Sequence, residues 1–286
     1  MARVAGHNRG GALPELERKG DGRAAVRWLR AGGWGLARMG SILALALAWE
    51  LLARSGAFTP FMLPSLSAVL ERIWSDLISG DLLLNTAVTL YRALAGFLIG
   101  AVAGIALGMA ITRSTVAHWF FDPVVSVGFP MPKIAFLPVV MLWLGVYDLS
   151  KITMVSVEAV FPVVTATIIG IRGVERELIW SARNVGAGER ELLWQIAFPA
   201  ALPQIITGLQ VALPIALIVA IVTEMFMGGY GLGGVMNTAS RFADSRGVFA
   251  GIVEIAVVGY ALVKLMALAR RRLLLWHQEA VAPSTV

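Results

Sequence analysis

The residue types that most often carry out catalysis are scarce in this chain of 286 residues. It has no cysteine and only three histidines, which lie far apart at His7, His118 and His277. No nucleophile stands beside a general base, and no group of residues has the spacing of a metal site. The run G-A-G-E-R-E at 186–191 lacks the lysine and hydroxyl residue of a phosphate-binding loop. We therefore expect no enzyme activity, no metal and no cofactor on this chain.

The remaining candidates for chemistry are charged residues within long apolar stretches. A charge inside a membrane is costly and often marks the path of a solute. The alternative for each is an ion pair between helices, or a side chain that reaches the membrane surface. Lys133 is the best candidate to meet an anionic substrate, and Glu158 and Glu224 are acidic candidates for the same pathway. Glu50, Glu254 and Lys264 are further charges of this kind.

These charges interrupt a composition that is typical of a membrane protein. Hydrophobic residues make up 58% of the chain and charged residues 15%, against about 25% charged in soluble domains. Residues 93–112 contain no charge, and a helix of that length spans the hydrocarbon layer of a bilayer. The net charge of +6 comes from basic residues beside apolar spans, which is a pattern of membrane topology rather than of nucleic-acid binding.

The apolar stretches predict an all-α membrane protein with about six transmembrane helices. Residues 1–33 read as a flexible basic cytoplasmic tail, 34–275 as the membrane domain and 276–286 as a C-terminal tail. A cleaved signal peptide is the alternative for the N-terminus, but several spans follow the first apolar run, which favours a retained helix. The predicted spans are 34–53, 90–112, 117–146 with an interruption, 152–171, 205–223 and 248–268.

Two of the spans have special features. Gly96, Gly100, Gly104 and Gly108 recur every four residues and form one stripe, which predicts close packing with a neighbouring helix and, as an alternative, a gate. Pro130 and Pro132 interrupt the third span beside Lys133. Irregular backbone at membrane depth needs a neighbouring protein surface or a water-filled cavity. The interruption therefore either lines a cavity or separates two short elements at the interface.

Basic residues set the expected orientation. Most of the 24 Lys and Arg residues fall on one side of a six-span arrangement, in the N-terminal tail, in segment 172–204 and at Arg270–Arg272. This excess predicts that both termini and segment 172–204 are cytoplasmic. The outer side then receives the amphipathic stretch 65–79 and a glycine-rich loop that starts with the glycines at 228–234 and ends near Asp244–Arg246.

Segment 172–204 is the most informative part of the sequence. Its spacing predicts a helix over 175–184, a turn at Gly186 and Gly188, and a second helix over 189–198 that Pro199 and Pro203 end. Apolar residues such as Trp180 and Trp194 punctuate an otherwise polar stretch. A solvated linker does not need them, whereas a docking surface does.

The segment resembles the cytoplasmic "EAA" motif of binding-protein-dependent ABC permeases, which runs E-A-A, three residues, G, nine residues, I, one residue, L-P. Ala182 matches the second alanine, and Gly186, Ile196 and Pro199 follow at the motif's intervals. The departures are Trp180 for glutamate, Ser181 for the first alanine and Phe198 for leucine. Residues 129–151 and the run Phe249-Ala250-Gly251-Ile252 look like the sulfonate, taurine and nitrate branch, and the likeness covers about 35–275.

The resemblance implies a type I ABC importer permease in the bacterial inner membrane. The resemblance implies that the subunit pairs with a second copy of itself as a homodimer. It also implies two ATP-binding cassette subunits that hold ATP and magnesium, and an extracytoplasmic solute-binding protein. The ATPase would dock on Trp180, Ser181, Ala182, Arg183, Asn184, Gly186, Ala187, Ile196 and Pro199. The implied cargo is a small anionic solute such as a sulfonate, nitrate or taurine. An ion-gradient-driven secondary transporter and a membrane-embedded enzyme or assembly protein are the alternatives.

Overall fold

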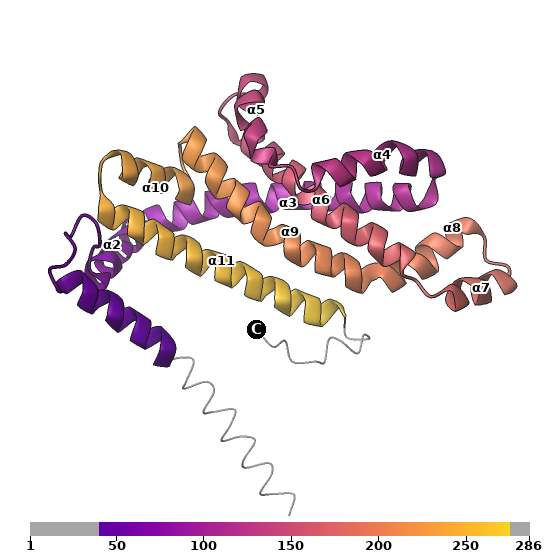
Figure 1. The fold of residues 1–286 in the computed structure, drawn as a ribbon, viewed down its shortest axis with the longest axis horizontal. Coiled ribbons are helices and arrows are strands. Elements are labelled where there is room, and N and C mark those ends of the chain that lie inside the picture. Colours follow the sequence, from indigo (N-terminus) through magenta and orange to yellow (C-terminus); the bar gives the residue numbers. More distant parts are fainter. Residues whose placement is uncertain (1–39, 275–286) are drawn as a thin grey trace, which may run out of the picture. The chain divides into compact units, whose positions relative to one another are not determined.

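The computed structural model describes residues 40–274, and this range is helical without any β-strand (Figure 1). The described residues up to 67 and those from 68 onward form two compact units. In the first, residues 40–54 are helical, and Glu50 accepts hydrogen bonds from Arg54 Nε at 2.6 Å and Ser67 N at 3.1 Å. The first expected span, 34–53, lies only partly within the described residues. The tails at 1–33 and 276–286 lie outside them.

The second unit contains four helices long and apolar enough to cross a membrane: α3, α6, α11, and a 39-residue run at 189–227 that ends in α9. The pair of α4 and the segment 133–144, which meet at 94°, is a fifth candidate and forms either a broken span or a re-entrant loop. These match the second to sixth expected spans. The elements are α2 (Leu66–Ser79), α3 (Asp81–Arg113), α4 (Thr115–Gly128), a 3-10 turn (Lys133–Phe136), α5 (Leu137–Leu144), α6 (Asp148–Arg172), α7 (Arg176–Asn184), α8 (Glu189–Glu191), a π-helical turn (Leu192–Ala197), α9 (Phe198–Met227), α10 (Leu232–Arg241) and α11 (Ser245–Leu273).

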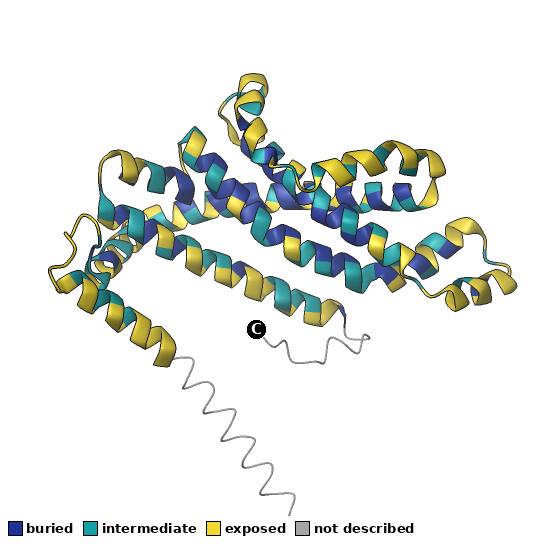
Figure 2. Cartoon of the chain, viewed as in Figure 1, coloured by how far each residue is buried: buried dark blue, intermediate teal, exposed yellow. Residues whose placement is uncertain are grey.

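The long helices define two ends of this unit. Helices α3, α6 and α11 start near α10, whereas α9 runs the opposite way and starts beside α7 and α8 (Figure 1). We refer to these as the α10 end and the α7 end. Figure 2 shows that buried residues concentrate on α3, α6 and α9, while α11, α4 and α5 are exposed along much of their length. The core is therefore a layer of three helices with α6 in contact with both others.

The glycine stripe of α3 is where α3 and α6 meet. A methyl carbon added to Gly100 would lie 2.7 Å from the carbonyl oxygen of Ser156 and 2.8 Å from Ala159 Cβ. Added to Gly108, it would lie 2.6 Å from Thr167 Cβ. All four glycines are buried, so the sequence-based prediction of close packing is confirmed. The two helices run in the same direction, and each glycine meets the next turn of α6.

Two expectations about helix boundaries are wrong. Pro199 and Pro203 do not end a helix before the membrane, because Pro199 lies in the first turn of α9 and Pro203 lies inside it. The π-helical turn at Leu192–Ala197 widens the backbone just before Pro199, which makes room for a ring that would otherwise meet the preceding turn.

The glycine-rich stretch at 228–234 is not entirely a loop either. Gly228, Gly229 and Gly231 form a turn with positive φ, but α10 begins at Leu232 and includes Gly233 and Gly234. A side chain at Gly233 would collide with the carbonyl of Ile221 on α9. Gly233 and Gly234 therefore allow α10 to pack closely against its neighbours. This packing stabilises the helix although glycine has a low intrinsic helix propensity.

The α3–α6 contact gives a first prediction. Gly100→Leu forces the two backbones apart and should destabilise the fold by about 1–3 kcal/mol, as overpacking of a core typically does. We expect a lower temperature of thermal aggregation for the purified protein in detergent. Ala106→Leu is the control, because Ala106 lies on the exposed side of the same helix. Equal stability of the two variants would contradict the assignment of this stripe as the main packing contact.

Candidate functional site

The segment between α6 and α9 folds into two short helices joined by a tight turn at the α7 end. Gly186 has a φ of +89°, and it donates a hydrogen bond to the carbonyl of Arg183 at 3.0 Å. Ala187 N donates to the carbonyl of Ala182 at 3.1 Å. This pair of bonds closes a helix through a left-handed glycine. The predicted role of Gly186 is confirmed, whereas Gly188 has an ordinary φ of −76° and does not need to be glycine for that reason.

Contacts across the turn fix the start of the second helix. Glu191 Oε2 accepts a hydrogen bond from Gly188 N at 3.0 Å, and Arg183 Nη2 lies 2.8 Å from Glu189 Oε1. The latter pair is exposed, so water and salt screen it and it adds little stability. The turn is therefore held mainly by backbone hydrogen bonds and by the cap on α8.

A groove of about 500 Å³ runs between α7 and the start of α9. Four of the nine predicted coupling residues line it: Ser181 and Ala182 from α7, and Ile196 and Pro199 from the opposite wall. Val185, which sequence reasoning did not select, is 85% exposed at its edge. We call this the α7 groove, and its full lining is Leu178, Ser181, Ala182, Val185, Gln195, Ile196, Pro199 and Ala200.

The other five coupling candidates surround the α7 groove without lining it. Trp180 is 55% exposed on α7, and Arg183 and Asn184 are exposed at the end of that helix. Gly186 and Ala187 form the turn. The structure thus brings all nine residues to one tip of the chain. Trp180 and Val185 expose apolar side chains at this tip, which is typical of a surface that another protein covers.

Lys133 and Glu158, two of the pathway candidates, lie together at the break between α4 and α5. Lys133 Nζ is 3.6 Å from Glu158 Oε2 and donates to the carbonyls of Gly128 at 2.9 Å and Met131 at 3.2 Å. It also lies 4.5 Å from the centre of the Phe161 ring. These contacts tie the broken span to α6. An ammonium group has three donors, and in this conformation backbone carbonyls and Glu158 surround them.

Glu224, the third pathway candidate, lies on α9 at the α10 end and is fully buried. Its Oε1 is 2.7 Å from Arg92 Nη1, and its Oε2 accepts hydrogen bonds from Thr89 Oγ1 at 2.8 Å and Gly233 N at 3.1 Å. Arg92 also pairs with the half-exposed Asp148 at 2.7 Å and donates to the carbonyl of Tyr230 at 2.6 Å. Two ion pairs and a backbone hydrogen bond of Arg92 thus join α3, α6, α9 and the turn before α10.

The sequence analysis did not single out Arg92 or Lys151, two further residues of this cluster. Lys151 is 2% exposed and donates to the carbonyl of Gly228 at 2.9 Å. The signal available in the sequence was the number of acidic residues in spans, since a buried carboxylate requires a cation nearby. The presence of Glu224 in a span therefore indicated that a cationic side chain lies near it, but it did not indicate which one.

Comparison with known proteins places this geometry in context. The family described as "Binding-protein-dependent transport system inner membrane component" matches residues 96–274. The chain is 32% identical over 273 residues to SsuC of Bacillus subtilis (strain 168), a permease protein named for aliphatic sulfonates transport, which covers 94% of this chain and 96% of the relative. It is 28% identical over 256 residues to the taurine transport system permease protein TauC of Escherichia coli (strain K12), covering 86% and 93%.

The fold also occurs in a solved structure. The crystal structure of an amino acid ABC transporter with histidines matches with a TM-score of 0.57 and 16% identity, over 71% of this chain and 96% of the other. At that identity the likeness concerns the fold alone. It agrees with the arrangement of long helices and short connecting helices described above.

The buried ion pair gives a second prediction. Glu224→Gln leaves Arg92 buried without its main counter-charge, which should cost about 3–5 kcal/mol of stability. The measurement is thermal aggregation of the purified protein in detergent. Asp148→Asn is the matched control, because it contacts the same guanidinium from a side chain that is 55% exposed, and we expect at most about 1 kcal/mol there. A larger effect for Asp148→Asn would contradict this ranking.

Proposed function

This chain belongs to the family of binding-protein-dependent transport system inner membrane components, the permease subunits of ABC importers, and we propose that it carries a small organic sulfonate or a related anion. The observation that supports this cargo is the similarity to SsuC along 96% of that relative. The chain is a multi-pass protein of the inner membrane, and its relatives are transport permeases rather than enzymes.

In this proposal a partner chain hydrolyses ATP, and that partner binds at the α7 groove. The groove is apolar, open and situated at a tip formed by two short helices, so a partner can enclose it without rearranging the core. Small residues at Ser181, Ala182 and Gly186 allow close approach of a second backbone. When the partner moves, the enclosed helix α7 moves with it as a rigid body.

The full assembly is proposed to contain two copies of this chain, two ATP-binding cassette subunits and one extracytoplasmic solute-binding protein. In that arrangement the α7 end faces the cytoplasm, together with both termini, and the α10 end faces outward. Lys133, Glu158 and Glu224 stay candidates for the pathway in a conformation that opens their present ion pairs. Uptake that continued after depletion of ATP would contradict the importer and favour a secondary transporter.

Docking of the ATPase is tested by Val185→Glu. The new carboxylate would be buried unpaired in the interface, and we expect the ATPase subunit to bind at least about tenfold more weakly in a pull-down from membranes, since 1.4 kcal/mol is a factor of ten. Val185 makes little packing in the free chain, because it is 85% exposed, so stability should not change.

The control is Arg190→Glu, which adds a carboxylate to the same segment outside the α7 groove. It should retain ATPase binding within about twofold. Equal binding by wild type, Val185→Glu and Arg190→Glu would show that the ATPase does not use this groove.

Orientation is tested with single cysteines, because the natural chain has none. We expect a membrane-impermeant maleimide to label Phe242→Cys in intact spheroplasts, since Phe242 is 80% exposed at the α10 end. Asn184→Cys at the α7 end should react only after the membrane is permeabilised. The reverse pattern would contradict a cytoplasmic α7 end and with it the docking proposal.

A further inference from the structure

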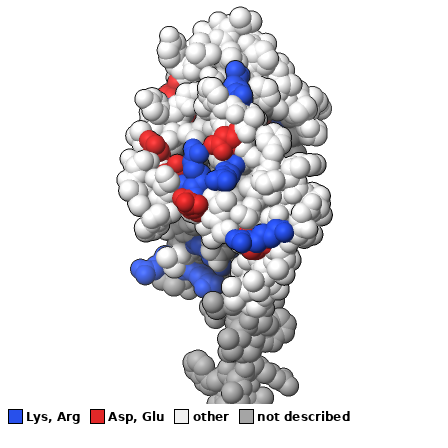
Figure 3. Space-filling view, turned by 90° about the vertical axis from the view of Figure 1, so that its left-hand side faces the viewer, with Lys and Arg blue, Asp and Glu red and all other residues white. Residues whose placement is uncertain are grey.

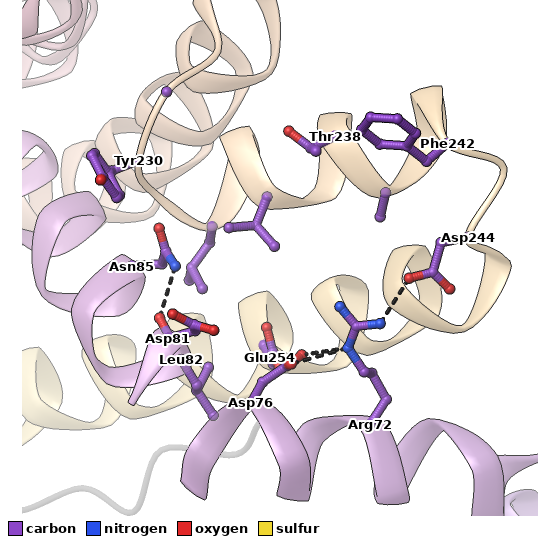
Figure 4. Close-up of a pocket in the computed structure, with 14 residues that line it drawn as sticks. Arg72, Asp76, Asp81, Leu82, Asn85, Tyr230, Thr238, Phe242, Asp244 and Glu254 are labelled. Atoms are coloured by element: carbon purple, nitrogen blue, oxygen red, sulfur yellow. Dashed lines mark hydrogen bonds and ion pairs between the residues drawn. The ribbon is translucent and has the colours of Figure 1, made fainter. Parts of the chain in front are cut away.

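A cavity of about 470 Å³ opens at the α10 end among α2, α3, α10 and α11 (Figure 4). This volume lies within the range of small-molecule sites. Nothing in the proposed mechanism of cargo transport uses it. It is lined by Arg72, Asp76, Asp81, Leu82, Asn85, Gly229, Tyr230, Leu232, Val235, Thr238, Ala239, Phe242, Asp244 and Glu254.

The lining has a strong excess of negative charge. It contains four carboxylates and one cation, Arg72, which pairs with Asp76 at 3.0 Å and with Asp244 at 2.8 Å. Burial acts to lower the pKa of Arg72, but hydrogen bonds and charge attraction from Asp76 and Asp244 outweigh it and raise that pKa. Figure 3 looks onto the α10 end and shows acidic and basic side chains gathered together within a largely uncharged surface. Arg72 forms its ion pairs with Asp76 and Asp244, so among the lining residues Asp81 and Glu254 have no direct ion pair, although Glu254 also feels the charge of Arg72.

Glu254 is the feature that points to a ligand. It lies on α11 with 8% of its surface exposed, and its Oε1 is buried without a hydrogen-bond partner. An unsatisfied buried acceptor costs about 1–3 kcal/mol, so a donor placed beside it is strongly favoured. In Figure 4 Glu254 lies beside Asp76, so a donor that enters the cavity at Glu254 also meets the negative charge of a second carboxylate.

The residues that line the cavity limit the chemical class of ligand that it can bind. An anion such as a sulfonate is repelled by the carboxylates, so the site differs from one for the proposed cargo. Among residues 40–274 no group of three or more His, Asp or Glu side chains is arranged to hold a metal ion. The apolar part of the lining is formed by Leu82, Leu232, Val235 and Phe242. Such a cavity suits a charged donor carried on a hydrocarbon stem.

We propose that this cavity binds a primary ammonium group on a short apolar stem, with Glu254 as its main acceptor and Asp81 as a further carboxylate of the same lining. The ammonium is either that of a free organic amine or that of a lysine side chain on a protein docked at the α10 end. The site depends only on residues of this chain, and it stands whether or not the proposed cargo is correct.

The test uses the full chain in lipid nanodiscs and n-butylammonium as the probe. We expect saturation-transfer NMR to detect binding of n-butylammonium but not of n-butanesulfonate, which has the same stem and the opposite charge. Glu254→Gln should weaken n-butylammonium binding by about tenfold, because a charge-assisted hydrogen bond is replaced by a neutral one. Asp81→Asn should also weaken n-butylammonium binding. Because Asp81 is exposed, this variant tests the site even if Glu254→Gln fails to fold.

Glu71→Gln is the matched control, since Glu71 is an exposed carboxylate on α2 outside the cavity. Binding within about twofold of wild type is expected for it. Absence of n-butylammonium binding, or equal binding by wild type, Glu254→Gln and Asp81→Asn, would overturn the proposal.

A second measurement identifies the source of the ammonium group. If n-butylammonium competes with docking of the extracytoplasmic binding protein, and Glu254→Gln weakens that docking, the natural ligand is a lysine of that protein. If docking is unaffected while n-butylammonium still binds, the natural ligand is a free amine. Loss of docking for every variant, Glu71→Gln included, with n-butylammonium binding intact, would instead contradict the proposed assembly and leave this site standing.

Discussion

The close approach of α3 and α6 is the contact on which the other features of the chain depend. Within a bilayer, lipid tails are as apolar as leucine side chains, so helices associate through tight packing rather than through exclusion of water. Four buried glycines allow that packing by letting the backbone of α3 touch the side chains of α6. Because α3 and α6 lie this close together, α9 can contact both of them. The buried side chains of the three helices therefore meet at fixed positions.

Charge is the second constraint, and packing determines where it can be satisfied. Arg92 on α3 and Glu224 on α9 are both buried, and neither is stable in that environment without the other. Their separation of 2.7 Å depends on the spacing of the three core helices. The same pair orders the turn before α10 through the carbonyl of Tyr230 and the amide of Gly233. A structural ion pair thus shapes one wall of the cavity that contains Glu254.

Features with a local signal could be predicted from the sequence, and features that need distant residues could not. The period of four in the glycines is local, and it predicted the α3 contact. The spacing from Ala182 to Gly186 is also local, and it predicted the end of α7. Arg92 and Glu224 lie 132 residues apart, so nothing in the sequence pairs them. Pro203 and the glycines of α10 gave misleading local signals, because tertiary packing overrides propensity at those positions.

Helix α9 joins the two ends whose roles differ. With α8 and the π-helical turn it forms a run of 39 residues, about 58 Å long. Ile196 in the α7 groove lies near its start, and Glu224 lies near its finish. In the proposed mechanism, a partner that displaces the α7 groove pulls on α9, which carries the buried carboxylate at its far end. Pro203 and Pro214 each remove one backbone hydrogen bond from α9, so bending concentrates there. Bending at either proline would reduce the part of such a displacement that reaches Glu224.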